Sequence, residues 1–321
     1  MLFLNRKQSG ELSIGQASIA GAGAWAADTY RPSSAALVIE TPAAAAKQTC
    51  GSVECISARP SPWRNRKRPI FEGSWGCSGR CVLAMVRAAV RRETGDGLDM
   101  VHAKHQHRLP LGLLMLAQGW ITHPQLQYAL SIQKMRGGRI GDLLVEECGI
   151  DREQVTRALS MQWSCPVLVA RGFSANAMAP VAPKIFIEQF GVVPLRVAGS
   201  SLLYLGFEDH LDAAAAFALE QMTVLKAESG LMPTEEYREA RAALMRQPFV
   251  AAEMERIAEA DALAARITAI LEQKQPTASK LVRMHQYLWL RLWLEPSSKG
   301  KKGTVPRSHE DMLDYIFTIG R

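Results

Sequence analysis

The apolar and polar positions of the chain recur in the same order twice between residues 111 and 162. Residues 112–133 align on residues 141–162 without a gap, at a constant offset of 29, and 8 of the 22 paired positions are identical. The identical pairs are Gly112/Gly141, Leu114/Leu143, Ile121/Ile150, Gln125/Gln154, Ala129/Ala158, Leu130/Leu159, Ser131/Ser160 and Gln133/Gln162. Because the register never shifts, the segment is predicted to hold two copies of one structural unit.

Each copy has the pattern of a helix, a turn and a second helix. Apolar residues spaced i, i+3, i+4 form one face of a short first helix, namely Leu111, Leu114, Met115 and Ile140, Leu143, Leu144. Gly119 and Gly149 are predicted to end these helices, because glycine tolerates the left-handed C-cap conformation. Thr122 and Asp151 are predicted N-caps of the second helices, and a glutamine three residues later predicts a capping box in both copies. Two such hairpins would pack as a four-helix unit.

The periodicity changes after Pro166. Short apolar runs predict strands at 167–170, 192–197, 202–207 and 224–227, with helices at 183–190, 211–222 and 233–246. The order β-α-β-β-α-β-α indicates a small sheet backed by helices, so the predicted fold class is α+β. Further on, we predict a charged amphipathic helix over 249–273 and a terminal capped helix over 308–319. The apolar segment 278–294 would be either buried against the α/β unit or interfacial.

Four regions follow from these patterns. Residues 1–100 are predicted to be disordered and basic with one short helix, because residues 1–70 are rich in Ala, Ser, Gly and Pro and lack a period. Tandem helical repeats occupy 108–165, a small α/β subdomain 166–247, and a C-terminal helical extension 248–321. No run of 18 uncharged apolar residues occurs, so we expect no membrane span.

The net charge of +7 lies in the first third of the chain. Residues 1–110 hold 15 Lys/Arg and 8 Asp/Glu, whereas the remainder holds 23 of each. The basic cluster at 64–68 is either a solvated linker or a contact for anionic lipid or nucleic acid. Residues 80–93 are predicted to form a short basic amphipathic helix, which would either lie on a membrane surface or dock on a partner domain. No specific nucleic-acid partner is expected.

Metal and catalytic motifs are weak in this sequence. Cys50/Cys55 and Cys77/Cys81 suggest halves of a zinc site, but their spacers of four and three residues are looser than the usual knuckle, so no metal is expected. The histidines at 102, 105 and 107 fall in a predicted linker and are not expected to bind metal. The P-loop, the Gly-x-Ser-x-Gly elbow and His-Glu-x-x-His are all absent, so we predict a protein that is not an enzyme and has no cofactor.

The second copy resembles a known family in its motif residues. Arg139-Ile-Gly141, Leu143, Gly149, Ala158-Leu159 and Gln162 are similar to the repeated motif of the MshEN domain, the N-terminal domain of type II secretion and pilus assembly ATPases. The resemblance covers residues 108–245. It implies a regulatory module that binds cyclic di-GMP between two such motifs, in the cytoplasm or at the periphery of the inner membrane.

The resemblance also implies a set of ligand-binding residues. They are Arg108, Leu111, Gly112, Leu114, Gln133, Arg139, Ile140, Gly141, Leu143 and Gln162. Arginine would pair with a phosphate or a guanine edge, and the glutamine amides would bond to guanine. In the first copy, however, Pro110 stands where the motif has arginine and Trp120 where it has glycine.

A second interpretation of the same domain is an adaptor. The segment Leu109-Pro-Leu-Gly112 and the apolar stretch 281–294 resemble the cytoplasmic tail of phage-adsorption-type membrane glycosyltransferases, which carry the same domain. In that case the chain would dock to an inner-membrane secretion or glycosyltransferase component without binding a nucleotide.

Overall fold

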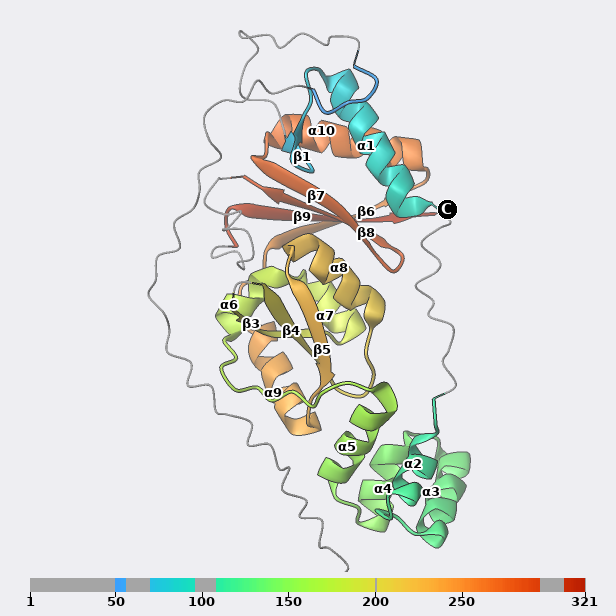
Figure 1. Cartoon of the computed structure of the whole chain (residues 1–321). Coiled ribbons are helices and arrows are strands. Elements are labelled where there is room, and N and C mark those ends of the chain that lie inside the picture. Colours follow the sequence, from blue (N-terminus) through green and yellow to red (C-terminus); the bar gives the residue numbers. More distant parts are fainter. Residues whose placement is uncertain (1–49, 56–69, 96–107, 200, 295–308, 321) are drawn as a thin grey trace, which may run out of the picture. The chain divides into compact units, whose positions relative to one another are not determined.

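The computed structural model describes residues 50–55, 70–95, 108–199, 201–294 and 309–320 (Figure 1). All of them lie in one compact unit that spans residues 43–321. Helices and sheets are mixed, as the predicted α+β class requires. The predictions for residues 1–49, for the basic cluster at 64–68 and for the three histidines at 102, 105 and 107 fall outside the described residues.

The two copies of the repeat form four helices. The first copy supplies α2 (Leu111–Ala117) and α3 (His123–Arg136), and the second supplies α4 (Ile140–Cys148) and α5 (Arg152–Trp163). Helix α2 packs mainly against α5, and α4 packs mainly against α3, so each first helix contacts the second helix of the other copy. The apolar stripes that define the repeat meet in a core of their own around Met115, Leu144 and Ala158.

Both predicted N-caps, Thr122 and Asp151, are confirmed, but the predicted capping box forms in the first copy only. Thr122 Oγ1 accepts a hydrogen bond from Gln125 N, and the Gln125 side chain accepts one from Thr122 N, which completes the capping box. The capping box predicted for the second copy is wrong. Asp151 Oδ1 accepts from Glu153 N at 2.9 Å, because the short carboxylate caps the first turn by itself.

A three-stranded sheet follows the repeats. Its strands are β3 (Val193–Ala198), β4 (Leu202–Phe207) and β5 (Lys226–Leu231), with β3 and β4 antiparallel and β4 and β5 parallel. The helical elements around it are α6 (Ala175–Met178), the 3-10 turn η2 (Ala179–Val181), α7 (Lys184–Phe190), α8 (Ala213–Thr223) and α9 (Thr234–Met245). The strand predicted at 167–170 is reduced to one bridge between Val167 and Leu231.

The predicted C-terminal helical extension is wrong. Residues 251–319 form β6 (Ala251–Ile257), α10 (Ala260–Lys274), β7 (Ala278–Met284), β8 (Tyr287–Trp293) and β9 (Met312–Ile319). The four strands make a sheet in the order β6-β9-β8-β7, in which only the β6/β9 pair is parallel. All seven residues of β8 are buried, because apolar layers cover both faces of this sheet.

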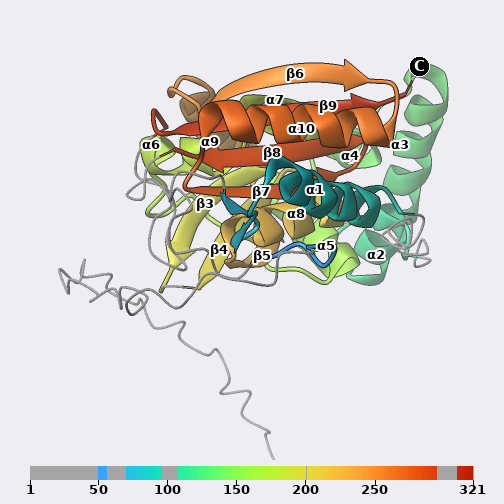
Figure 2. The same ribbon diagram turned by 90° about the horizontal axis from the view of Figure 1, so that it is seen from above.

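The two faces of the C-terminal sheet contact different parts of the chain. Leu288, Leu290 and Leu292 face a core shared with α10 and with α1 (Gly79–Thr94), which lie side by side on that face (Figures 1 and 2). Tyr287 and Trp289, which alternate with these leucines, instead join the core of the three-stranded sheet. The C-terminal sheet is therefore sandwiched between helix layers.

Part of the predicted disordered N-terminal region is folded. Strands β1 (Ile70–Phe71) and β2 (Ser74–Trp75) form a small hairpin, and Glu72 N on its turn donates to Ser279 O of β7 at 2.9 Å. Arg92 of α1 makes a bidentate pair with Glu72 at 2.7 and 2.9 Å. The amphipathic helix predicted at 80–93 is present as α1, and it docks on α10 of the same chain, which is the packing alternative rather than the membrane one.

A buried ion pair links the C-terminal sheet to the middle of the chain. Arg291 of β8 and Asp314 of β9 make a bidentate pair at 2.7 and 2.8 Å, and their side chains are 1% and 0% exposed. Arg291 Nη1 also donates to the carbonyl of Pro180 in η2 at 2.7 Å, and Trp289 Nε1 donates to Asp314 at 2.8 Å. A buried charge pair persists when its remaining donors and acceptors are satisfied, as they are here.

Candidate site on the repeated helices

The residues predicted to bind a ligand differ widely in accessibility. Arg108 and Arg139 are exposed, whereas Leu114, Gln133, Ile140 and Gln162 are half-buried. Leu111, Gly112, Gly141 and Leu143 are buried within the four-helix core. Leu143 is only 6% exposed, so it packs against neighbouring helices and offers no flat surface to a base. The accessible part of the predicted set is centred on the two arginines.

The repeated glycines pack helices closely. A Cβ atom at Gly112 would lie 2.5 Å from Leu126 Cδ1, and one at Gly141 would lie 2.9 Å from Val155 Cγ1. Leu126 and Val155 are themselves paired positions of the repeat, so each glycine faces the same position of the second helix in its own copy. Gly112 and Gly141 belong to the predicted ligand-binding set, but their geometry gives them a packing role that the repeat alone did not reveal.

The repeated glutamines bridge the two copies. Gln133 Nε2, near the end of α3, donates to Gly138 O before α4 at 2.8 Å. Gln162 Nε2, near the end of α5, donates to Leu109 O before α2 at 2.7 Å. Leu109 and Gly138 are also separated by 29 residues, so the two bonds are equivalent. Each glutamine thus fixes the backbone that leads into the first helix of the other copy, and these reciprocal contacts relate the copies by an approximate two-fold axis.

The two exposed arginines are joined by a line of side-chain contacts. The guanidinium of Arg108 lies 3.4 Å above the ring of Trp163, and that ring lies 6.5 Å from the ring of His210. His210 Nδ1 is 2.8 Å from Asp209 Oδ1, and Asp209 Oδ2 is 2.9 Å from Arg139 Nη1. Arg108, from before α2, and Arg139, from the start of α4, therefore belong to one polar cluster.

The electrostatics of this cluster follow from its hydrogen bonds. The bond from His210 holds the pKa of Asp209 below its ordinary value, so the carboxylate stays ionised. The same bond raises the pKa of His210 above its ordinary value, although partial burial works against the shift. Arg139 also lines a cleft of about 440 Å³ together with Asp209, Arg238 and Arg241.

Asp209 and His210 were not predicted from the sequence, because they lie on the loop after β4, outside the repeats.

The ends of the first helices explain one departure from the motif. In the second copy, Gly149 takes φ +66 at the end of α4, and in the first copy Gly119, one position earlier, takes φ +70 after α2. Trp120 therefore does not need the left-handed conformation, because Gly119 adopts it instead. The departure at Pro110 has no such compensation, since Pro110 is the exposed N-cap of α2.

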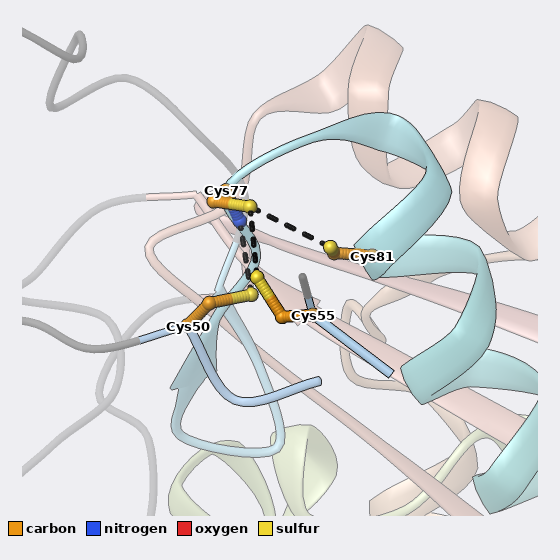
Figure 3. A group of neighbouring side chains, drawn as sticks. All are labelled: Cys50, Cys55, Cys77 and Cys81. Carbon is orange, nitrogen blue, oxygen red and sulfur yellow. Dashed lines mark hydrogen bonds between the residues drawn. The ribbon is translucent and has the colours of Figure 1, made fainter. Parts of the chain in front are cut away.

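A second cluster, far from the repeats in sequence, has metal-ligand chemistry. The sulfur atoms of Cys50, Cys55, Cys77 and Cys81 all lie within 4.8 Å of one another, and Figure 3 shows the four side chains converging. The expectation that these cysteines form no site came from their spacing along the chain. The fold overrides that spacing by bringing the segment 50–55 onto the start of α1.

Comparison with known proteins gives partial matches. No family model matches the chain. A stretch of 94 residues is 33% identical to the type IV pilus assembly ATPase PilB of Myxococcus xanthus. This match covers 29% of the present chain and 17% of PilB. The chain therefore spans less than a fifth of the length of this relative.

Two solved structures are also similar to part of the chain. A structure of MshE with cdg (cyclic di-GMP) aligns with 42% of this chain and 98% of its own, at 25% identity and a TM-score of 0.36. The N-terminal domain of XpsE aligns with 41% of this chain and 92% of its own, at 16% identity and a TM-score of 0.31. Within the described residues, no helix is both long and apolar enough to cross a membrane. The sequence match to a pilus assembly ATPase confirms the predicted resemblance: the chain is similar to the MshEN family, the N-terminal domains of type II secretion and pilus assembly ATPases.

Proposed function

We propose that this chain is a non-catalytic regulatory module that binds cyclic di-GMP at the polar cluster around Arg108 and Arg139. The observation that carries the proposal is the contact line Arg108–Trp163–His210–Asp209–Arg139, which joins the exposed arginines that precede the first helix of each copy. A cyclic dinucleotide carries two phosphates and two flat bases. Guanidinium groups pair with phosphate in a bidentate manner, and they and aromatic rings stack on bases.

The symmetry of the repeats supports the same ligand. Cyclic di-GMP has two identical halves, and the Gln133 and Gln162 bonds give the backbone before α4 and before α2 equivalent surroundings, so each half of the ligand would meet a similar helix start. The two copies nevertheless differ in charge, because Arg139 in the second is matched by Pro110 in the first. The Arg139–Asp209 pair must also open or rotate for Arg139 to reach a phosphate.

Titration calorimetry on the full chain tests this function. We expect saturable cyclic di-GMP binding that Arg139→Ala abolishes. Arg136→Ala is the matched control, because both side chains are 60% exposed and each pairs with one carboxylate, Glu147 for Arg136 and Asp209 for Arg139. The proposal fails if near-millimolar cyclic di-GMP gives no heat, or if both variants weaken binding equally.

An adaptor role is the second candidate, favoured by exposed apolar side chains on the repeats. Leu113, Tyr128, Leu130, Met135 and Met161 are each 46–76% exposed. Exposed apolar surface that gathers on one domain is typical of a docking face. An adaptor would capture an inner-membrane secretion or glycosyltransferase component equally well with and without cyclic di-GMP, and Leu113→Ser together with Leu130→Ser would abolish capture while sparing nucleotide binding.

A further inference from the structure

The four cysteines come from two separate backbone segments, residues 50–55 and 77–81. Cys50 and Cys55 flank a short turn in which Cys55 N donates to Ser52 O at 3.2 Å. Cys77 follows β2, and Cys81 lies in the first turn of α1, where its N–H donates to the N-cap Ser78 at 3.2 Å. Gly51 N donates to Trp75 O at 2.8 Å, which seats the first segment on the hairpin. The backbone therefore holds all four cysteines in place independently of the sulfur contacts.

The sulfur separations are close to those of a four-cysteine zinc site. Cys77 Sγ lies 3.5 Å from Cys55 Sγ and 3.5 Å from Cys81 Sγ. These separations are far longer than a disulfide bond of about 2.05 Å. Four sulfurs placed about 2.3 Å from a central zinc ion would be about 3.8 Å apart, which is close to the separations seen here. The backbone N–H of Cys77 also donates to Cys50 Sγ at 3.3 Å, so the fourth sulfur is held against the same group.

We propose that Cys50, Cys55, Cys77 and Cys81 bind one zinc ion as a closed structural site. On binding, each thiol loses its proton to solvent, four Zn–S bonds form, and no electron is transferred. A site with four cysteine ligands leaves no open position for water or substrate, so it stabilises the fold rather than catalysing a reaction.

Zinc binding itself would deprotonate the ligands. The thiolate, not the thiol, is the form that coordinates zinc, and a divalent cation at the centre of the four sulfurs drives the loss of their protons.

The metal would stabilise the layer formed by segment 50–55, the β1–β2 hairpin and α1, which packs on the C-terminal sheet. The β1–β2 hairpin and α1 both contact β7, and α1 packs along α10. The zinc ion would tie the segment 50–55 to the hairpin and to the start of α1, at the edge of this layer. The proposed site is therefore independent of cyclic di-GMP and of the repeats.

Metal content and cobalt substitution test the proposal on the full chain. Plasma mass spectrometry of protein purified without added chelator is expected to find about one zinc per chain. Replacement of the metal by Co²⁺ is expected to give the intense thiolate-to-cobalt absorption of a four-sulfur site. The proposal is overturned if zinc is substoichiometric and Co²⁺ gives no such band, if the bound metal is iron, or if mass spectrometry finds disulfides among these cysteines under reducing conditions.

Serine variants assign the ligands. The double variant Cys50→Ser/Cys55→Ser removes two ligands while leaving the hairpin and α1 untouched, and it is expected to lose zinc and the cobalt band. Cys148→Ser and Cys165→Ser are matched controls, because these free cysteines lie outside the cluster, and both variants should retain the metal. Zinc retained by the double variant, or lost by both controls, would contradict the assignment. If the double variant does not fold, removal of zinc from the wild-type chain by a chelator should expose α1 to proteolysis, and readdition should protect it.

Discussion

The two copies of the repeat share their packing and differ in their surface. In both, a glycine in the first helix packs against the second helix, and a glutamine holds the backbone before the other copy's first helix. At the N-cap of the first helix, however, Pro110 stands in one copy and Arg139 in the other. The positions that hold the four helices together are thus the same in both copies, whereas the exposed charge is not.

This difference distinguishes the residues that stabilise the fold from those that are available to a ligand. Gly112, Gly141 and both glutamines have partners within the chain, so their identity in the two copies needs no ligand. Among the described residues, the Arg139 side chain pairs with Asp209 and the Arg108 guanidinium lies over Trp163, and both arginines are exposed. A ligand would therefore depend most on the arginines, where the copies are unequal.

The largest effect is expected when the first copy is made like the second. Pro110→Arg places a guanidinium at the equivalent N-cap, whose extended backbone resembles that of Arg139. One charge-assisted bond contributes about 1.5–3 kcal/mol, so cyclic di-GMP should bind roughly tenfold to a hundredfold more tightly. Calorimetry measures the gain. Pro110→Ala, which removes the ring without adding charge, should leave the affinity unchanged, and an equal gain in both variants would rule out the charge as the cause.

The second effect concerns stability and tests the shared packing. Gly112→Val and Gly141→Val force a branched side chain into the helix contact, and each should lower the free energy of unfolding by about 1–3 kcal/mol. The loss should be greater at Gly141, because Val155 is shorter and stiffer than Leu126, and Leu111 closes the other side. Urea unfolding followed by circular dichroism measures both. Ala117→Val, at an exposed position of α2, is the control and should cost less than about 1 kcal/mol. Because valine is a better helix former than glycine, propensity cannot explain a loss at Gly112 or Gly141, and a loss there no larger than the control's would contradict the packing role.

The repeats and the C-terminal sheet also differ in how far their sequences reveal them. Helices α2 to α5 keep one exposed face, so their period of 3.6 is visible. Strand β8 is buried on both faces and has no polar alternation to mark it as a strand. The edge strand β6 has the sequence Ala-Ala-Glu-Met-Glu-Arg-Ile, rich in helix-forming residues, and its pairing with β9 overrides that preference.

The candidate sites were only partly predictable for a related reason. Arg139 could be found from the repeat motif and Arg108 from its place two residues before Pro110, because both signals are local. Asp209 contacts Arg139 from 70 residues further along the chain, and Cys50 approaches Cys77 from 27 residues away. Contacts of this kind depend on how distant elements pack, and spacing along the sequence does not encode them.

A smaller effect is expected from the glutamines, and it should be equal in the two copies. Gln133→Ala and Gln162→Ala each remove one hydrogen bond to an exposed backbone carbonyl, which should cost about 0.5–1 kcal/mol of stability. The double variant should lose roughly the sum, since the two bonds lie in different places. Thermal unfolding of the four proteins measures this cycle. A loss confined to one glutamine would break the approximate two-fold relation between the copies.

The smallest effect is a pH dependence from His210, which contacts Asp209, the partner of Arg139. The hydrogen bond with Asp209 raises the pKa of His210, as does the charge of Asp212, whereas the charge of Arg139 lowers it. Because its bond to Asp209 raises the pKa of His210 above its ordinary value of 6.5, the imidazolium and its stabilising bond are fully present below 6.5 and are lost as pH rises through the raised pKa. One fewer positive charge beside the phosphate site should weaken cyclic di-GMP binding about threefold between about pH 6 and about pH 8. His210→Gln should flatten the profile while His123→Gln, on exposed α3, should not. A profile that stays steep in His210→Gln would show that another group titrates, and it would contradict a binding site at the His210–Asp209–Arg139 contacts.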